Sequence, residues 1–167
     1  MRSSNFPVLS NSAKSTVPFQ KRAVDSLTGH GTISEIVYSE ESPWVTHCIL
    51  LPLLLQLGCQ SRWQLWLTPQ QKLSRKWLEA CGLPLNKVMQ SRQTTAACAI
   101  DAMEKALHTG NYSVVIIWLD QDLTDDEYYR LTVAAESGSA LGFIMRPQDI
   151  SAGRPRNGIK IHSASYH

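Results

Sequence analysis

The chain has 167 residues, 43% hydrophobic and 18% charged, which is ordinary for a soluble globular protein and enough for one domain with a core. Its formal net charge of +2 is too small to indicate nucleic acid binding by itself. The four cysteines contain no C-x-x-C pair, which argues against a zinc site and favours a reducing cytoplasm over a secreted disulfide framework.

The first segment, residues 1–31, predicts a disordered arm. It carries eight Ser or Thr residues, a single acid and no apolar periodicity. The same composition is compatible with an organelle transit peptide, although the segment shows no clear amphipathic helix. A flexible joint at residues 29–31 then leads into the first predicted strand, residues 33–38.

A long apolar helix is predicted next, with Ser42 as its cap and Pro43 at its first helical position. Apolar residues occupy nearly every side of this helix, which predicts that it is buried nearly all round. Its most apolar run, residues 48–57, is about half as long as a membrane span, so we expect no membrane insertion. Pro52 predicts a kink, and Gly58 predicts the end of the helix.

Residues 61–87 are the stretch where we expect the function to reside, because they hold three of the five tryptophans among several cations. Residues 62–67 predict a strand. The spacing of Thr68 and Gln71 predicts a capping box and a new helix, for which Gly82 supplies a left-handed stop. The side of this helix that is expected to face the core carries Leu73, Trp77, Ala80 and Cys81.

The second half of the chain continues to alternate between helix and strand patterns. Helical spacing predicts one helix whose buried side carries Ala99, Ile100, Met103, Ala106 and Leu107. Residues 112–119 form a continuous apolar run, which is typical of a strand buried on both faces of a parallel sheet. Thr124 and Glu127 form a second capping box, and the helix that it starts is expected to end at Gly138. Further strands are predicted at residues 87–90, 140–145 and 158–162.

Strand and helix patterns alternate four times over about 110 residues. This alternation predicts an α/β domain whose mostly parallel sheet is flanked by helices and joined by right-handed crossovers. We place the domain at residues 32–150, after the arm and before a C-terminal segment, residues 151–167. The C-terminal segment is rich in Ser and Gly, and we expect it to end outside the packed core.

An α/β domain raises the question of nucleotide binding. Residues 114–120 look like a Walker B strand, because an apolar run ends in a carboxylate, Asp120, that could hold Mg²⁺. The sequence contains neither G-x-x-x-x-G-K-S/T nor G-x-G-x-x-G, so the phosphate loop that must accompany such a strand is missing. Glu40 and Glu41 follow the first predicted strand and would repel phosphate. We therefore expect no nucleotide cofactor and no hydrolysis.

The remaining chemistry-bearing residues favour structural roles. The five histidines lie in unrelated segments, without the paired spacing that a zinc site needs. The sequence also lacks the G-x-S-x-G elbow of a serine hydrolase. Neither a metal nor a catalytic site is predicted.

Charge is unevenly distributed along the chain. Residues 60–92 contain six bases and one acid, a net charge of +5, whereas residues 120–136 contain six acids and one base, a net charge of −5. Such opposite faces suggest association with an acidic partner protein, or head-to-tail with another copy as a homodimer. They are also compatible with two solvated helix faces. The acidic segment disfavours a non-specific DNA binder.

Six motifs of uncommon composition stand out: Ser61-Arg-Trp-Gln-Leu-Trp-Leu-Thr-Pro-Gln-Gln-Lys-Leu-Ser-Arg75, Gly82-Leu-Pro-Leu, Lys87-Val-Met-Gln, Thr109-Gly-Asn-Tyr-Ser-Val-Val-Ile, Gly142-Phe-Ile-Met-Arg-Pro147 and Tyr166-His167. Together they resemble the SulA family of bacterial cell-division inhibitors, over roughly residues 32–167. The resemblance implies a RecA-like fold without a phosphate loop. It also implies a cytoplasmic protein that is made during the SOS response to DNA damage.

The same resemblance implies the partner and the mode of action. SulA-type proteins bind the tubulin-like GTPase FtsZ on the side that bears its T7 loop, and so block its polymerisation and its GTPase activity. The family's FtsZ-binding residues match Arg62, Leu67, Trp77 and Lys87. Because helical spacing turns Trp77 toward the core, Trp77 either touches the partner or supports the surface from beneath. Arg62 and Lys87 are the more direct contacts.

The resemblance further implies that the Lon protease removes the protein through its C-terminal end. Tyr166 and His167 would then serve as the degradation signal, since a pocket can read such side chains. The alternative function, from a different class, is a degenerate RecA-like nucleotide-binding protein or switch. Equilibrium nucleotide binding with and without Mg²⁺ separates the two.

Overall fold

The chain folds as alternating strands and helices around one sheet. The structure, a computed structural model, describes residues 30–38, 43–67, 75–148 and 159–160. Its elements are β1 (Thr32–Tyr38), α2 (Pro43–Gly58), β2 (Trp63–Leu67), α3 (Arg75–Ala80), the 3₁₀ helix η1 (Leu85–Lys87), β3 (Val88–Ser91), α4 (Ala96–His108), β4 (Tyr112–Trp118), α5 (Asp125–Gly138), β5 (Leu141–Pro147) and β6 (Ile159–Lys160).

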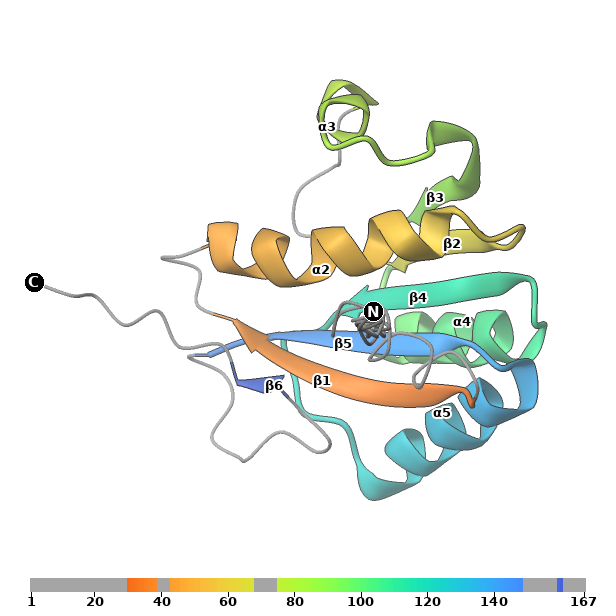
Figure 1. Ribbon diagram of the computed structural model, residues 1–167. Coiled ribbons are helices and arrows are strands. Elements are labelled where there is room, and N and C mark those ends of the chain that lie inside the picture. Colours follow the sequence, from red (N-terminus) through yellow and green to blue (C-terminus); the bar gives the residue numbers. More distant parts are fainter. Residues whose placement is uncertain (1–29, 39–42, 68–74, 149–158, 161–167) are drawn as a thin grey trace, which may run out of the picture.

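The six strands form a single sheet in the order β3-β2-β4-β5-β1-β6 (Figure 1). All of its strand pairs are parallel, so the strands begin at one edge, the amino edge, and end at the opposite carboxyl edge. The predicted α/β class is confirmed. The short strand predicted at residues 158–162 is confirmed as β6, and it brings this part of the C-terminal segment to the sheet beside β1.

Helices cover both faces of the sheet, α2 and α3 on one and α4 and α5 on the other (Figure 1). Successive residues of β4 alternate between the two cores, with Ile117 under α4 and α5 and Ile116 under α2 and α3. Both side chains are 0% exposed. Burial on both faces explains why this strand is a continuous apolar run, as predicted. The five residues predicted to line the buried side of α4 are all buried.

Local side chains set the start of α5. The Thr124 hydroxyl accepts a hydrogen bond from the Glu127 N–H at 3.2 Å, and the Glu127 carboxylate accepts one from the Thr124 N–H at 2.8 Å. This reciprocal pair confirms the second capping box. The first one, which was predicted with Thr68 and Gln71, lies outside the described residues.

The short helix α3 faces the core differently from the prediction. Leu78 is 5% exposed, whereas Ala80 is exposed and Cys81 is half-buried, so the prediction that Ala80 faces the core is wrong. Gly82 adopts the predicted left-handed conformation with φ 74°, and the Leu83 N–H returns to the Leu78 carbonyl at 3.0 Å. This turn buries Leu78 and Leu83 together and thereby orients a helix of only six residues.

Helix α2 begins at Pro43 and ends at Gly58, as predicted, but over residues 50–58, whose burial the structure describes, it is not buried nearly all round. The side that faces the sheet buries Leu50, Leu54 and Leu57. Pro52 is exposed, and the leucines beside it are only half-buried. Leucines occupy both the inner and the outer side of this helix, so the sequence pattern does not reveal that only one side is buried. Among the described residues, no helix has the length and hydropathy to cross a membrane.

Candidate protein-binding surface

Two of the four predicted binding residues meet at the amino edge of the sheet. Arg62 precedes β2, and its Nη2 donates to the side-chain oxygen of Gln60 at 3.5 Å. Lys87 ends η1, directly before β3, and its Nζ donates to the backbone carbonyl of the same Gln60. The two cations come together because β2 and β3 are parallel neighbours, so the residues that precede them lie at the same edge.

Arg62 also binds the end of a distant helix. Its Nη1 donates to the carbonyls of Gly138 at 3.2 Å and Ser139 at 2.9 Å. These carbonyls lie at the C-terminus of α5, where orphan acceptors and the helix dipole favour a cation. Sequence reasoning missed this role, since the contact joins residues 76 positions apart and neither segment carries a local sign of it.

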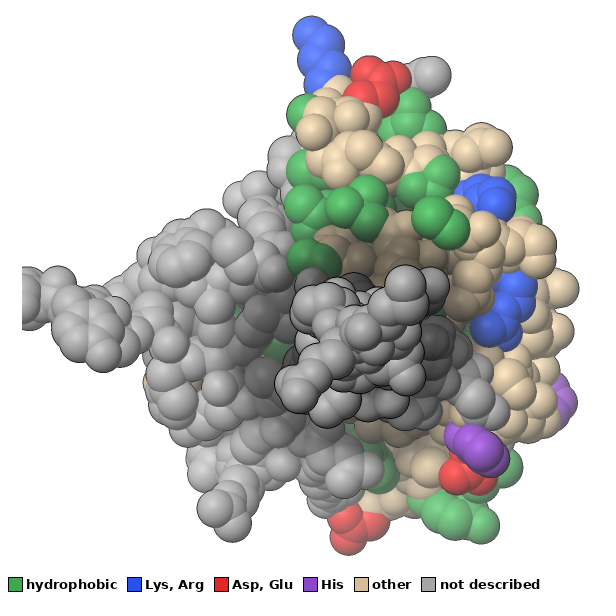
Figure 2. Space-filling view, in the orientation of Figure 1, with side chains coloured by type: hydrophobic (Ala, Val, Ile, Leu, Met, Phe, Trp, Pro, Cys, Tyr) green, Lys and Arg blue, Asp and Glu red, His purple; other side chains and the backbone are tan. Residues whose placement is uncertain are grey.

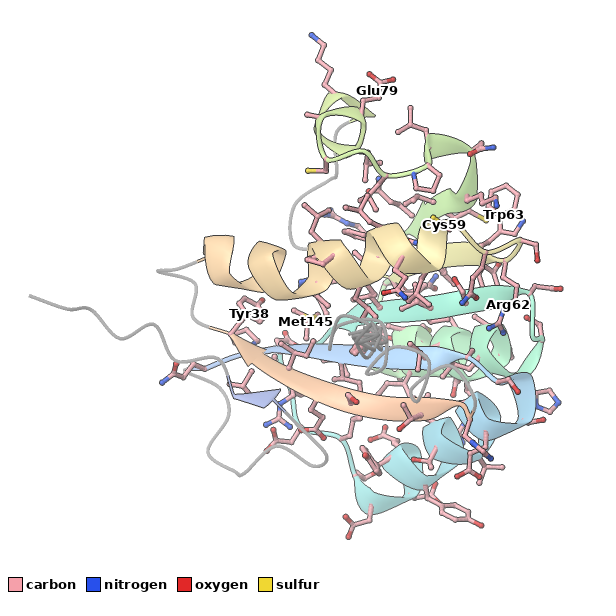
Figure 3. The ribbon with its side chains drawn as sticks, in the orientation of Figure 1. Tyr38, Cys59, Arg62, Trp63, Glu79 and Met145 are labelled. Atoms are coloured by element: carbon pink, nitrogen blue, oxygen red, sulfur yellow. The ribbon has the colours of Figure 1, made fainter. Side chains whose placement is uncertain are left out.

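A shallow hollow of about 430 Å³ opens beside these cations, lined by Ser61, Arg62, Trp63, Met89, Gly110, Asn111 and Tyr112. We call these residues, together with Gln60 and Lys87, the amino-edge surface. Trp63 is 42% exposed and Met89 is 44% exposed. Figure 3 places Trp63 and Arg62 at the same end of the molecule, and Figure 2 shows basic side chains exposed on that side.

The other two predicted binding residues do not join this surface. Leu67 is 1% exposed and lies in the core at the far end of β2, about 16 Å along the strand from Arg62. Leu67 can therefore influence a partner surface only through packing. Trp77 belongs to α3, which contacts η1, the element that carries Lys87. The side chain of Trp77 lies outside the described part of the structure.

The basic segment predicted from the sequence is divided in space. Arg62 and Lys87 lie at the amino edge, whereas Arg92 follows β3 at the carboxyl edge. Lys76 is exposed on α3, which lies on the α2 face. The acidic residues 120–127 follow β4 and open α5, so they gather at the carboxyl edge. The acids of residues 120–127 thus gather at one edge, whereas the basic segment contributes only Arg62 and Lys87 to the amino edge.

A buried ion pair explains part of the acidic segment. Arg146 of β5 donates to the Glu35 carboxylate of β1 at 3.3 Å, and the two side chains are 7% and 2% exposed. The other guanidinium nitrogen reaches Asp122 at 2.6 Å in the loop before α5. Each of the two carboxylates is bound to Arg146, so this cluster is structural and fastens that loop to the sheet.

A groove between α4 and α5 holds the second ion cluster. Arg130 of α5 bonds Glu104 and Asp101 of α4. The hydrogen bond to Glu104, followed by that to Asp101, raises the pKa of Arg130 above its ordinary value. Tyr129 and Val133 are exposed beside this cluster. The groove therefore combines a self-compensated charge cluster with two apolar side chains.

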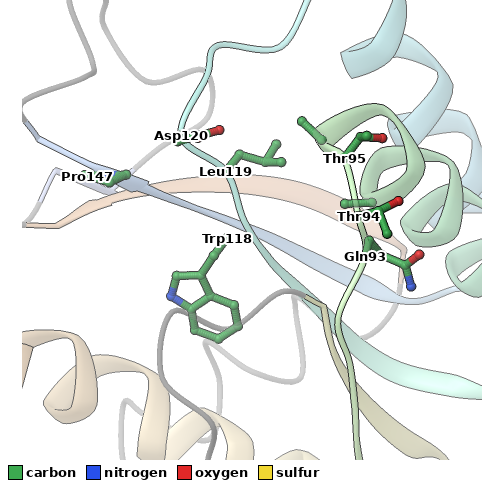
Figure 4. A pocket seen from close by; sticks show the side chains of 9 residues that line it. Gln93, Thr94, Thr95, Trp118, Leu119, Asp120 and Pro147 are labelled. Carbon is green, nitrogen blue, oxygen red and sulfur yellow. The ribbon is translucent and has the colours of Figure 1, made fainter.

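A third hollow, of about 330 Å³, lies at the carboxyl edge, where α/β proteins commonly bind nucleotides. Its walls include Thr94 and Thr95, directly before α4, and Trp118 and Asp120, at and just after the end of β4 (Figure 4). Its described lining contains no Lys or Arg to pair with a triphosphate. In the described ranges, no group of three His, Cys, Asp or Glu side chains is placed to hold a metal ion.

Comparisons with known proteins agree on one family. The family described as cell division inhibitor SulA matches residues 31–142. The cell division inhibitor SulA of Cronobacter sakazakii is 60% identical over 139 residues, which cover 82% of this chain and 83% of the relative. That of Escherichia coli O139:H28 is 53% identical over 169 aligned positions, covering 100% of both chains.

The fold agrees with that of a solved structure. The crystal structure of SulA from Pseudomonas aeruginosa superposes with a TM-score of 0.58 at 27% sequence identity. The superposition covers 69% of this chain and 97% of that chain. The relatives are named as inhibitors rather than as enzymes.

Proposed function

Because this chain belongs to the cell division inhibitor SulA family, we propose that it stops division by binding FtsZ, the GTPase of the division ring. It binds the side of FtsZ that bears the T7 loop and so blocks both polymerisation and GTP hydrolysis. It acts in the cytoplasm during the SOS response, by occupying an interface and without catalysis. The Lon protease clears it through Tyr166 and His167, which lie outside the described residues.

The observation that carries this proposal is the meeting of Arg62 and Lys87 at Gln60 on an open surface. Exposed Trp63 and Met89 lie on the same surface, and protein interfaces are enriched in tryptophan, methionine and arginine. The surface lies at the amino edge, away from the carboxyl edge where α/β folds usually bind small ligands. These features support a protein partner.

The proposal predicts inhibition that saturates near an equimolar ratio. Purified protein is titrated into FtsZ with GTP, while phosphate release and light scattering report hydrolysis and polymerisation. Each copy blocks one FtsZ interface, so both signals should fall in proportion to the protein added. Complete loss of GTPase activity at a small molar fraction, progressing with time, would contradict binding as the mechanism.

The alternative, a nucleotide-binding protein or switch, is favoured by the Walker B-like strand and by the hollow beside Asp120. Equilibrium dialysis of the purified protein with ATP or GTP, with and without Mg²⁺, measures nucleotide binding directly. We expect no saturable binding, because the sequence lacks a phosphate loop.

A further inference from the structure

Large hydrophobic side chains are exposed in two places on the described part of the molecule. One place is the amino-edge surface, with Trp63 and Met89, and the other is the groove between α4 and α5, with Tyr129 and Val133. Exposed aromatic side chains that cluster with other apolar ones are typical of binding sites. The two places differ in their backbone support and in their charges.

The backbone holds Trp63 in a fixed position. Its N–H donates to the Asn111 carbonyl at 3.0 Å, and its carbonyl accepts a hydrogen bond from the buried Ser113 hydroxyl at 3.3 Å. The pairing of β2 with β4 shifts register between Trp63 and Gln64. Such irregularities are found where a strand redirects a side chain next to a functional site. Trp63 is therefore presented to solvent with its backbone ordered beforehand, which lowers the entropic cost of binding.

Met89 completes the apolar part of this surface. It lies on β3, the edge strand beside β2, and lines the same hollow as Trp63. A methionine side chain is flexible and polarisable, so it can adapt to a partner around the rigid indole. Together the two side chains offer an apolar centre of the kind that dominates binding energy in protein interfaces.

The two cations beside this apolar centre have no carboxylate partner among the described residues. Arg62 and Lys87 donate to backbone carbonyls and to the Gln60 side chain, and among the described residues neither forms an ion pair. Their charges remain available to carboxylates of a partner. In the α4–α5 groove, by contrast, Arg130 is paired with two acids, and with Lys105 the groove holds two bases and two acids that balance within the chain. Charge complementarity therefore favours the amino-edge surface as the docking site.

We infer that Trp63 and Met89 form the apolar anchor by which this chain binds FtsZ, seated in an apolar depression of FtsZ that is rimmed by carboxylates. This inference rests on the proposed function and adds two residues to it. Arg62 and Lys87 then supply the cationic rim, and their contribution weakens as salt concentration rises.

The test is the dissociation constant for FtsZ, measured by isothermal titration calorimetry with the full chain and four single variants. Trp63→Ser should weaken binding roughly 30-fold and Met89→Ser about tenfold, as central interface residues do. The matched controls, Tyr129→Ser and Val133→Ser, remove exposed hydrophobic side chains from the other site and should change binding by less than about twofold. Thermal melting checks that each variant is folded.

Each outcome supports or overturns the anchor. If the unmodified chain binds FtsZ and the variants at positions 63 and 89 bind as tightly, the anchor is wrong while the proposed function stands. The anchor is equally wrong if the Tyr129 variant loses as much affinity as the Trp63 variant. If the unmodified chain does not bind FtsZ, both proposals fail. Should Trp63→Ser not fold, Met89→Ser on the exposed edge strand decides alone.

Discussion

Arg62 performs two tasks with one guanidinium group. It contributes positive charge to the amino-edge surface, and it holds the last carbonyls of α5 at 2.9 and 3.2 Å. A lysine would keep the charge but lose the planar fork that reaches two acceptors and Gln60 at once. A loss of FtsZ binding on mutation of Arg62 therefore has two possible origins, a lost contact and a displaced surface.

The stability of Arg62 variants separates these origins. Arg62→Ala should lower the free energy of unfolding by about 1–2 kcal/mol, because carbonyls at a helix end lose their donors. Arg92→Ala removes an exposed arginine at the carboxyl edge and should change it by less than about 0.5 kcal/mol. Urea denaturation of both variants measures the difference. Equal stability of the two would mean that Arg62 contributes only to the surface.

Helices α4 and α5 lie close together where α5 ends. A Cβ atom on Gly138 would lie 1.8 Å from the Leu107 carbonyl oxygen of α4, a distance at which the backbone must move. The carbonyl of Gly138 is also an acceptor for Arg62. This glycine therefore connects helix packing on one face of the sheet to the position of the amino-edge surface.

At the end of α5 we predict that Gly138→Ala lowers the free energy of unfolding by about 1–3 kcal/mol, because the added methyl group overpacks against backbone rather than against a mobile side chain. It should also weaken FtsZ binding, because the acceptor of Arg62 shifts. Ser137→Ala, at the neighbouring exposed position, serves as control and should leave both properties unchanged. A Gly138→Ala variant as stable as the unmodified chain would contradict the close approach of the two helices.

Sequence reasoning succeeded where chemistry is local to an element. The capping box of Thr124 and Glu127 and the left-handed stop at Gly82 involve residues within a few positions, so the sequence predicts them directly. It failed where position depends on distant elements. The helix-capping role of Arg62 depends on where α5 ends in space, which short-range patterns do not encode.

At the scale of the whole molecule, the proposed function includes removal of the protein by the Lon protease. We predict that deleting Tyr166 and His167 lengthens the lifetime of the protein in cells that contain Lon, without changing its melting temperature. Both residues follow β6, the last described element, and no described contact depends on them. The half-lives of the full and the shortened chain are measured by following each protein after synthesis has been stopped. Cells without Lon provide the control. Equal half-lives in cells with Lon would refute the proposed role of Tyr166 and His167 as a degradation signal.

The position of β1 in the sheet has a consequence for synthesis on the ribosome. Thr32 pairs with Leu141, so the first strand finds its neighbour β5 only after another 109 residues have been made. At bacterial elongation rates of about 5–20 residues per second, this interval is about 5–20 s. β6 in turn needs β1 in place. The nascent chain must therefore keep β1 unpaired until translation is nearly complete, and the central sheet can close only after residues 141–147 have left the ribosome.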